Sequence, residues 1–347
     1  MALAAVIHDK AVEFGFDGCG IVKMDAFEEH FDHVRERFRL FPEIAEHRQL
    51  REYYMAVVMP EGMPDYAKAV IVCTVRYGKY TLPQHMIGRV GKAYMTDHRR
   101  EEGTVFYEAV QNMHALLDDL GIRYTYDIGP ARWAAMKTGL GVLRKNNFFY
   151  NEHGSWHWLE TWVIDRELEY LNEPVALPPC PPQCGKCIDA CPTGALTEAH
   201  TLNAAKCIPL NTYLRYDSLP PAELRPYMRG WLYGCDACQD VCPMNRGKWE
   251  NGEPFHRLDE LSEHMRLEDI LTMPDERLNE MVVKKYWYIS KRRSWIWRAA
   301  ALRVMAVEYE PKYKTYIQNA LGHPHESVAE MAAWAWGYIR TIHGVTE

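Results

Sequence analysis

Residues 180–196 read CPPQCGKCIDACPTGAL, and residues 234–245 read GCDACQDVCPMN. A further cysteine, Cys207, lies between them, so eight of the ten cysteines of the chain fall within Cys180–Cys242. Each run contains a Cys-x-x-Cys pair and ends in Cys-Pro. Two such runs in one chain indicate two similar metal-binding loops.

The spacing of these cysteines predicts two [4Fe–4S] clusters. Three closely spaced thiolates wrap three corners of a cluster, and the cysteine before proline ligates the other cluster in two-cluster ferredoxins. One cluster is therefore predicted on Cys180, Cys184, Cys187 and Cys242. The other is predicted on Cys207, Cys235, Cys238 and Cys191. A structural zinc site is the alternative, but eight cysteines and two Cys-Pro endings favour iron–sulfur clusters.

The bulk composition is that of a globular enzyme without a membrane span. The 347 residues are 48% hydrophobic and 25% charged, with a net charge of −7. No stretch reaches the roughly 18 uninterrupted apolar residues that a transmembrane helix needs, and no signal peptide is recognisable. We expect a cytoplasmic protein, in which clustered cysteines bind metal, whereas Cys19 and Cys73 in apolar strands are packed thiols.

The hydrophobic pattern predicts an α+β protein with three domains. Residues 1–172 alternate predicted helices (3–14, 26–56 and 104–120) with predicted strands (19–22, 67–77, 122–127 and 159–165), which indicates an α/β or α+β domain. Residues 78–103 are predicted to form a loop that enters the helix at 104–120. Residues 173–250 hold the cysteines. Residues 251–347 end in alanine-rich helix pairs from Ser294 onward, a pattern that resembles a HEAT-type repeat.

Several motifs resemble epoxyqueuosine reductases. Residues 130–165 read PARWAAMKTGLGVLRKNNFFYNEHGSWHWLETWVID. They resemble the family's Gly-Leu-Gly-x-x-Gly-Lys-Asn run, which a Gly-Ser-Trp follows before the clusters. The stretches EFGFDGCGI, CPTGAL and YGCDACQDVCPMN are similar too, and they occur in the family's order. Arg144 occupies the position of a family glycine.

The resemblance implies a fold, cofactors and a reaction. Members of the family, and the related reductive dehalogenases, bind cobalamin beside two [4Fe–4S] clusters. The implied domains are a nitroreductase-like cobalamin domain, a ferredoxin-like double-cluster domain and a HEAT-like domain. The implied reaction reduces an epoxide on tRNA to an alkene through reduced cobalamin, with electrons from an external ferredoxin or flavodoxin.

The resemblance also implies roles for single residues. Those expected to contact the corrinoid are Lys145, Asn146, Gly154, Ser155 and Trp156. Asp97 is the nearest match to the family's acidic proton donor, and Tyr94 and His98 are other candidates. A buried carboxyl with a raised pKa could supply the proton that epoxide reduction requires.

One basic and aromatic stretch favours RNA as a substrate. Its members are Lys284, Lys285, Lys291, Arg292, Arg293, Arg298 and Arg303, interleaved with Tyr286, Trp287, Tyr288, Trp295 and Trp297. Basic side chains meet phosphates and aromatic rings stack on bases, although a helix with a solvated cationic face and aromatic core contacts is the simpler alternative. Two other functions stay open: reduction of a small molecule with the same cofactors, and non-catalytic electron transfer or corrinoid reactivation.

Overall fold

The computed structural model describes residues 2–46, 51–52, 59–214 and 218–346. At its centre lies an antiparallel four-stranded sheet in the order β1-β2-β7-β4. The strands are β1 (Gly18–Lys23), β2 (Ala69–Arg76), β7 (His157–Ile164) and β4 (Tyr124–Tyr126). All four had been predicted in nearly these positions.

Strand β2 is apolar along its length because both faces of the sheet are covered. Ala69, Ile71, Cys73 and Val75 pack in one core cluster, and Val70 and Val72 pack in another. Successive side chains of a strand point to opposite faces, so a strand between two helical layers is apolar at every position. Cys19 faces Cys73 across β1 and β2, and both are buried free thiols, as expected for packed residues.

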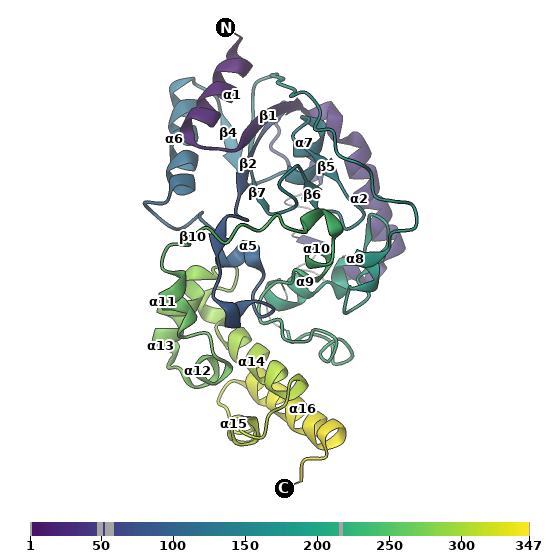
Figure 1. Cartoon of the computed structure of the whole chain (residues 1–347), viewed down its shortest axis with the longest axis vertical. Helices are drawn as coiled ribbons and strands as arrows, with labels where there is room; N and C mark the ends of the chain where they lie inside the picture. Colours follow the sequence, from purple (N-terminus) through teal and green to yellow (C-terminus); the bar gives the residue numbers. More distant parts are fainter. Residues whose placement is uncertain (1, 47–50, 53–58, 215–217, 347) are drawn as a thin grey trace.

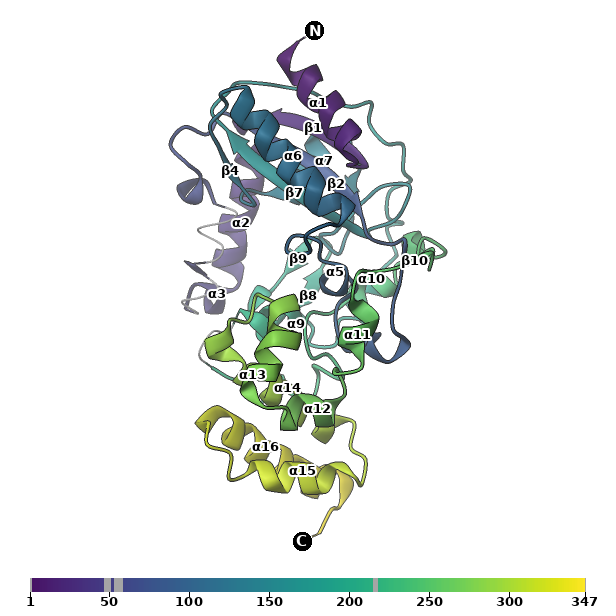
Figure 2. The ribbon, with the colours of Figure 1, turned by 90° about the vertical axis from the view of Figure 1, so that its left-hand side faces the viewer.

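Helices cover both faces of the sheet (Figures 1 and 2). Helices α1 (Leu3–Phe14) and α6 (Val105–Asp119) share a core with one face. Helix α7 (Ala131–Lys137) and residues of η1 (Met24–Phe27) and α2 (Glu28–Leu40) cover the other. The helix predicted over 26–56 is divided, since α3 (Pro42–Glu46) follows α2, and residues 47–50 and 53–58 lie outside the described residues.

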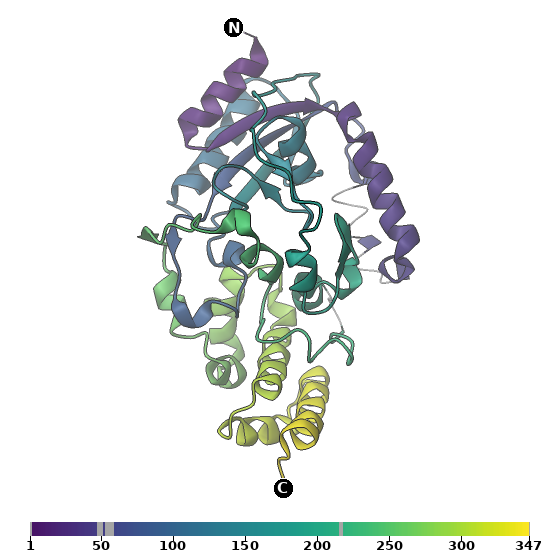
Figure 3. The same ribbon diagram turned by 45° about the vertical axis from the view of Figure 1, so that its right-hand side comes forward.

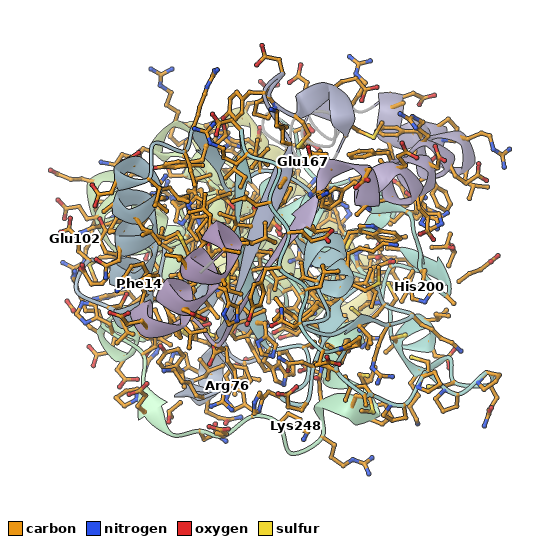
Figure 4. All side chains as sticks on the ribbon, turned by 90° about the horizontal axis from the view of Figure 1, so that it is seen from above. Phe14, Arg76, Glu102, Glu167, His200 and Lys248 are labelled. Carbon is orange, nitrogen blue, oxygen red and sulfur yellow. The ribbon has the colours of Figure 1, made fainter. Side chains whose placement is uncertain are left out.

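The loop predicted between β2 and α6 carries short elements that reach the lower half of the molecule. They are β3 (Tyr80–Thr81), η3 (Gln84–Met86) and α5 (Lys92–Met95). The end of β2 meets the chain that follows the second cysteine run: Arg76 forms an ion pair of 2.7 Å with Glu250. Figure 4 shows Arg76 and Lys248 at the same side of the molecule.

The cysteine region is built from short elements between the sheet and the helical end of the chain (Figure 3). It is preceded by the hairpin of β5 (Val142–Leu143) and β6 (Phe149–Tyr150), which the sequence pattern did not reveal. The helices are α8 (Lys186–Asp189), η4 (Ala204–Lys206), α9 (Ile208–Tyr213), α10 (Ala237–Asp240) and η5 (Pro243–Asn245). A hairpin of β8 (Leu196–Glu198) and β9 (Thr201–Leu202) completes it.

The C-terminal part is helical, as predicted, and begins earlier than its periodicity suggested. After β10 (Glu253–Pro254) come α11 (Leu258–Ser262), α12 (Leu267–Thr272), α13 (Asp275–Leu278), η6 (Asn279–Val283) and η7 (Lys291–Arg293). The last helices are α14 (Trp295–Val307), α15 (Tyr313–Ala320) and α16 (Glu326–His343). Their core also includes Met86, Val90 and Tyr233, so the C-terminal helices pack directly on the loops before α6 and before the second cysteine run.

Candidate functional site

The two cysteine runs form two matching turns. Cys184 precedes α8 and Cys235 precedes α10, and in each case the last cysteine of the run leads into a proline. The two helices lie side by side. Equal spacing in the sequence therefore becomes two similar loops that face each other in space.

The thiols of the two runs have neighbours from the opposite run. Burial raises the pKa of Cys187, and Cys242 and Cys180 raise it further. Burial likewise raises the pKa of Cys207 to about 12, with Cys191 adding to it. Burial first, and then Cys207 and Cys191, raise the pKa of Cys238. Cys242 thus acts on Cys187 of the first run, and Cys191 acts on Cys207 and Cys238, but Cys187 acts on Cys238 as well, so the exchange that the spacing predicts stays a prediction.

This set of soft donors fits a pair of iron–sulfur clusters. Crowded, partly buried thiols such as Cys207 and Cys238 resist ionisation because of their desolvation and because neighbouring thiolates repel one another, and a cationic iron core relieves that repulsion. The ligand role of each single cysteine stays a prediction.

Residues 144–146, between β5 and β6, bind the backbone of both cysteine loops. The Lys145 ammonium donates to the carbonyl oxygens of Pro181, Pro182 and Cys184, each at 2.9 Å. The Asn146 amide donates to Tyr150 Oη at 2.9 Å and to the Cys238 carbonyl at 3.0 Å. An ammonium has three N–H donors, so those of Lys145 are all engaged by the first cysteine loop. The corrinoid contacts expected of Lys145 and Asn146 stay predictions.

Gly154, Ser155 and Trp156 lie against the second cysteine loop. Ser155 accepts from Asn245 Nδ2 at 2.8 Å and donates to Gln239 at 2.9 Å, and its backbone N–H donates to Asn245 Oδ1 at 2.8 Å. Gly154 has φ of +85°, and a Cβ there would stand 2.5 Å from Asn245 Oδ1. The Trp156 ring is buried, and the ammonium of Lys92 lies 4.7 Å from its centre.

Asp97 is buried but ionised, contrary to the expected raised pKa. Arg99 binds its carboxylate in a fork, with Nε to Oδ1 at 3.0 Å and Nη2 to Oδ2 at 2.9 Å. Burial alone would raise the pKa of Asp97, but the guanidinium outweighs it and lowers the pKa to about 2. A paired carboxylate prefers its charged form even when desolvated. Tyr94, the second donor candidate, lies 2.6 Å from Tyr213, hydroxyl to hydroxyl.

The third candidate, His98, belongs to a buried acid–base cluster that the sequence did not predict. Its Nε2 lies 3.3 Å from Glu160 Oε1, and both side chains are 1% exposed. The Tyr126 hydroxyl donates to the other oxygen of Glu160. The sequence held one signal for this cluster: Glu160 lies inside the predicted strand LETWVID, and a charge that a strand buries needs a partner.

Asp127, the last residue of the strand predicted over 122–127, is a further acid beside this cluster. Its carboxyl is 3.3 Å from Arg99 Nη1, and its backbone adopts a positive φ of 59°. The Asp127 side chain is 46% exposed; its partial burial raises its pKa to about 6, with Arg99 opposing the shift and Glu160 supporting it. Asp97 and Asp127 thus share one arginine but have pKa values on opposite sides of the usual range for aspartate.

The predicted basic and aromatic stretch is not one surface. Arg298 and Arg303 are buried, where Arg298 pairs with Asp275 at 2.5 Å and Arg303 donates to backbone carbonyls. Tyr286 and Trp297 are core residues, as the simpler alternative of aromatic core contacts has it, and the burial of Arg298 and Arg303 removes both from any solvated cationic face. Lys284 and Lys285 instead line a charged groove of about 550 Å³ with Arg99, Arg100 and acidic side chains of α11 and η6.

Comparisons with known proteins agree with this geometry. A family model described as "4Fe-4S double cluster binding domain" matches residues 180–245. The epoxyqueuosine reductase of Leadbetterella byssophila is 30% identical over 250 residues, which cover 69% of this chain and 78% of that protein. The one from Cellulophaga algicola is 29% identical over 260 residues, covering 72% and 81%. The chain belongs to the epoxyqueuosine reductase family.

Solved structures of epoxyqueuosine reductases share the fold. The enzyme of Streptococcus thermophilus aligns with a TM-score of 0.75 at 22% identity, covering 98% of this chain and 91% of that one. An epoxyqueuosine reductase bound to an epoxyqueuosine-modified tRNA stem loop aligns with a TM-score of 0.70 at 23% identity, covering 97% and 90%. Membership of this reductase family makes the chain an oxidoreductase, and its double-cluster domain binds two [4Fe–4S] clusters. Among the described residues, no helix is both long and apolar enough to cross a membrane.

Proposed function

We propose that this protein reduces epoxyqueuosine in tRNA, converting the epoxide to an alkene. The observation that carries the proposal is the pair of cysteine loops, which residues 144–146 and 154–156 join to the sheet domain. The chain also belongs to the epoxyqueuosine reductase family. Iron–sulfur clusters transfer single electrons and need a catalytic partner. The sheet domain, with its buried acids, is the place for that partner.

The proposed partner is cobalamin, which supplies a strongly reducing cobalt centre when bound. Lys145, Asn146, Gly154, Ser155 and Trp156 would hold it. Two buried groups support such a ligand: Trp156 Nε1 and Tyr233 Oη have no hydrogen-bond partner among the described residues. Buried polar atoms seldom stay unsatisfied, and the amide arms of a corrinoid offer both donors and acceptors.

Proton delivery is proposed to involve the acids around Arg99. Asp97 remains the first candidate. A carboxyl with a pKa of about 2 holds no proton near neutrality, so Asp97 would donate only in a state in which Arg99 has released it. Asp127 is the second candidate, since its pKa of about 6 keeps a protonated fraction at working pH. Tyr94 and His98 stay alternatives.

The finer architecture and the partners are part of the same proposal. We assign residues 1–172 to a nitroreductase-like domain, 173–250 to a ferredoxin-like domain and 251–347 to a HEAT-like domain. A cytoplasmic ferredoxin or flavodoxin would supply the electrons. Arg100 and Lys284, which line the groove, are the cations proposed to meet tRNA phosphates, and the Arg100 guanidinium stands 4.2 Å from the Trp287 ring centre. Lys285 is paired with Glu101 there, at 2.9 Å.

The test is turnover by the anaerobically purified holoenzyme with epoxyqueuosine-containing tRNA and a low-potential reductant. We expect conversion to queuosine-tRNA, and a loss of roughly 100-fold or more in rate when the true proton donor is replaced. Asp97→Asn and Asp127→Asn identify that donor, and Asp32→Asn on the exposed face of α2 is the matched control.

Two results would contradict the proposal. A cobalamin-loaded enzyme that neither binds nor converts the tRNA would point to a small-molecule substrate. Iron without any affinity for cobalamin would point to an electron carrier.

A further inference from the structure

Arg144 is a buried cation with no carboxylate partner in the described part of the chain. Its side chain is 3% exposed, and no ion pair joins it to an acidic residue among those described. The guanidinium carbon lies 5.4 Å from the Tyr150 ring centre, and Nε has no hydrogen-bond partner there. A buried charge without a counter-charge is costly, so the folded protein should supply one.

The contacts of Arg144 point to the first cysteine loop. Nη1 donates to Cys180 Sγ at 3.5 Å, and Nη2 donates to the Pro178 carbonyl at 2.7 Å. The backbone holds the residue in place, because Arg144 donates to Phe148 O at 3.1 Å and accepts from Asn147 N at 2.8 Å in the β5–β6 turn. The missing counter-charge is then the thiolate of Cys180 and the anionic cluster bound to it.

The surroundings of the two clusters differ in charge. The Lys145 ammonium lies on the same loop as Arg144, held by three carbonyls, so two cations face the cluster of Cys180. The other loop contains Asp236 and Asp240, both paired with Lys92, and the only further cation that acts on Cys207 among the described residues is the exposed Arg132. Exposed Lys186 and Asp189 on α8 carry opposite charges and are screened by solvent.

We propose that Arg144 raises the reduction potential of the Cys180 cluster, so that this cluster is the first of the two to be reduced. Reduction adds one electron, taken from the external low-potential carrier, and needs no bond or proton transfer. A nearby cation and an N–H···S hydrogen bond stabilise the more negative, reduced cluster more than the oxidised one. Arg144 is thus a tuning residue that occupies the position of a family glycine.

The experiment is a potentiometric titration of the anaerobic holoprotein, followed by electron paramagnetic resonance. Variant Arg144→Gln removes the charge, and Arg144→Lys keeps the charge but loses the forked geometry. Arg340→Gln makes the same chemical change on exposed α16, at the far end of the molecule (Figure 1). A Cys207→Ala background, which removes a ligand of the second cluster, assigns each wave.

We expect two waves, with the more positive one from the Cys180 cluster. Arg144→Gln should move that wave to more negative potential and leave the other in place, Arg144→Lys should move it less, and Arg340→Gln should move neither. An unchanged first wave, or an equal shift of both waves, would overturn the proposal. Loss of the first cluster in both Arg144 variants would overturn it too, because Arg144 would then hold Cys180 in place. The inference concerns the clusters alone, so a failure of tRNA turnover leaves it standing.

Discussion

At the scale of single residues, the acids around Arg99 show how neighbours decide protonation. Asp97 and Asp127 both contact this arginine, at 2.9 and 3.3 Å. Asp97 receives a forked pair of hydrogen bonds, whereas Asp127 receives a single longer contact and lies beside the Glu160 charge. Forked guanidinium–carboxylate pairs are the stronger kind, which explains why the pKa of Asp97 falls to about 2 while that of Asp127 rises to about 6.

The Asp97–Arg99 pair should stabilise the protein throughout the neutral range. The folded pKa of about 2 lies below the unfolded value near 3.9, so the contribution is complete above about pH 4 and is lost as pH falls through 2. We expect Asp97→Asn to lower the free energy of unfolding by about 2 kcal/mol. The deficit should be constant between pH 5 and 8 in urea unfolding of the anaerobic holoprotein.

The matched control for that measurement is Asp32→Asn. Asp32 forms an exposed pair with Arg35, and such pairs contribute less than about 1 kcal/mol. A deficit in Asp97→Asn that changed within the pH 5–8 window would show that Asp97 titrates there, against the structure.

At the scale of elements, the two cysteine loops depend on each other. The Cys191 thiol belongs to the first run, yet it neighbours Cys207 and Cys238. We expect Cys191→Ser to damage the cluster on Cys207, Cys235 and Cys238 and to leave the other cluster intact. Iron content should fall from about eight atoms toward four, with the change in spectrum assigned to the second cluster.

Cys19→Ala is the control for the cluster exchange, because Cys19 is a buried strand thiol and the variant should keep its iron. Damage confined to the cluster on Cys180, Cys184 and Cys187 would refute the exchange.

The turn between β6 and β7 fits the second cysteine loop only if residue 154 is glycine. Gly154→Ala would combine a strained positive φ with a Cβ 2.5 Å from Asn245 Oδ1. We expect a loss of about 2 kcal/mol or more, read from the urea midpoint, and a weakened second cluster. Gly337→Ala, in open space on α16, should instead gain up to about 1 kcal/mol. Equal behaviour of the two variants would contradict this account of the turn.

At the scale of the whole molecule, Arg303 links the C-terminal helices to the cysteine region. It is 1% exposed on α14 and donates to the carbonyl of Arg229 at 2.6 Å and to that of Trp231. We expect Arg303→Met to lower the free energy of unfolding by about 3 kcal/mol, because two buried carbonyls lose their donor. Thermal unfolding followed by circular dichroism reports the helices, and the visible absorbance reports the clusters. We expect both signals to be lost at the same, lowered temperature.

The control for that linkage is Arg292→Met, at an exposed position on η7, which should change stability by less than about 0.5 kcal/mol. If Arg303→Met melted the helices while cluster absorbance persisted to the normal temperature, the two regions would be independent and the linkage wrong.

The sequence by itself determined the local features of this protein. Cysteine spacing specified the two cluster loops, and apolar periodicity located β2, α6 and α14, because both depend on residues close together in the chain. Tertiary structure decided which groups meet across long separations. It turned Asp97 into a paired anion, buried Arg303 in the core and placed Arg144 on Cys180. The reason is physical: protonation, burial and charge pairing depend on neighbours that folding, and not the order of residues, brings within a few ångströms.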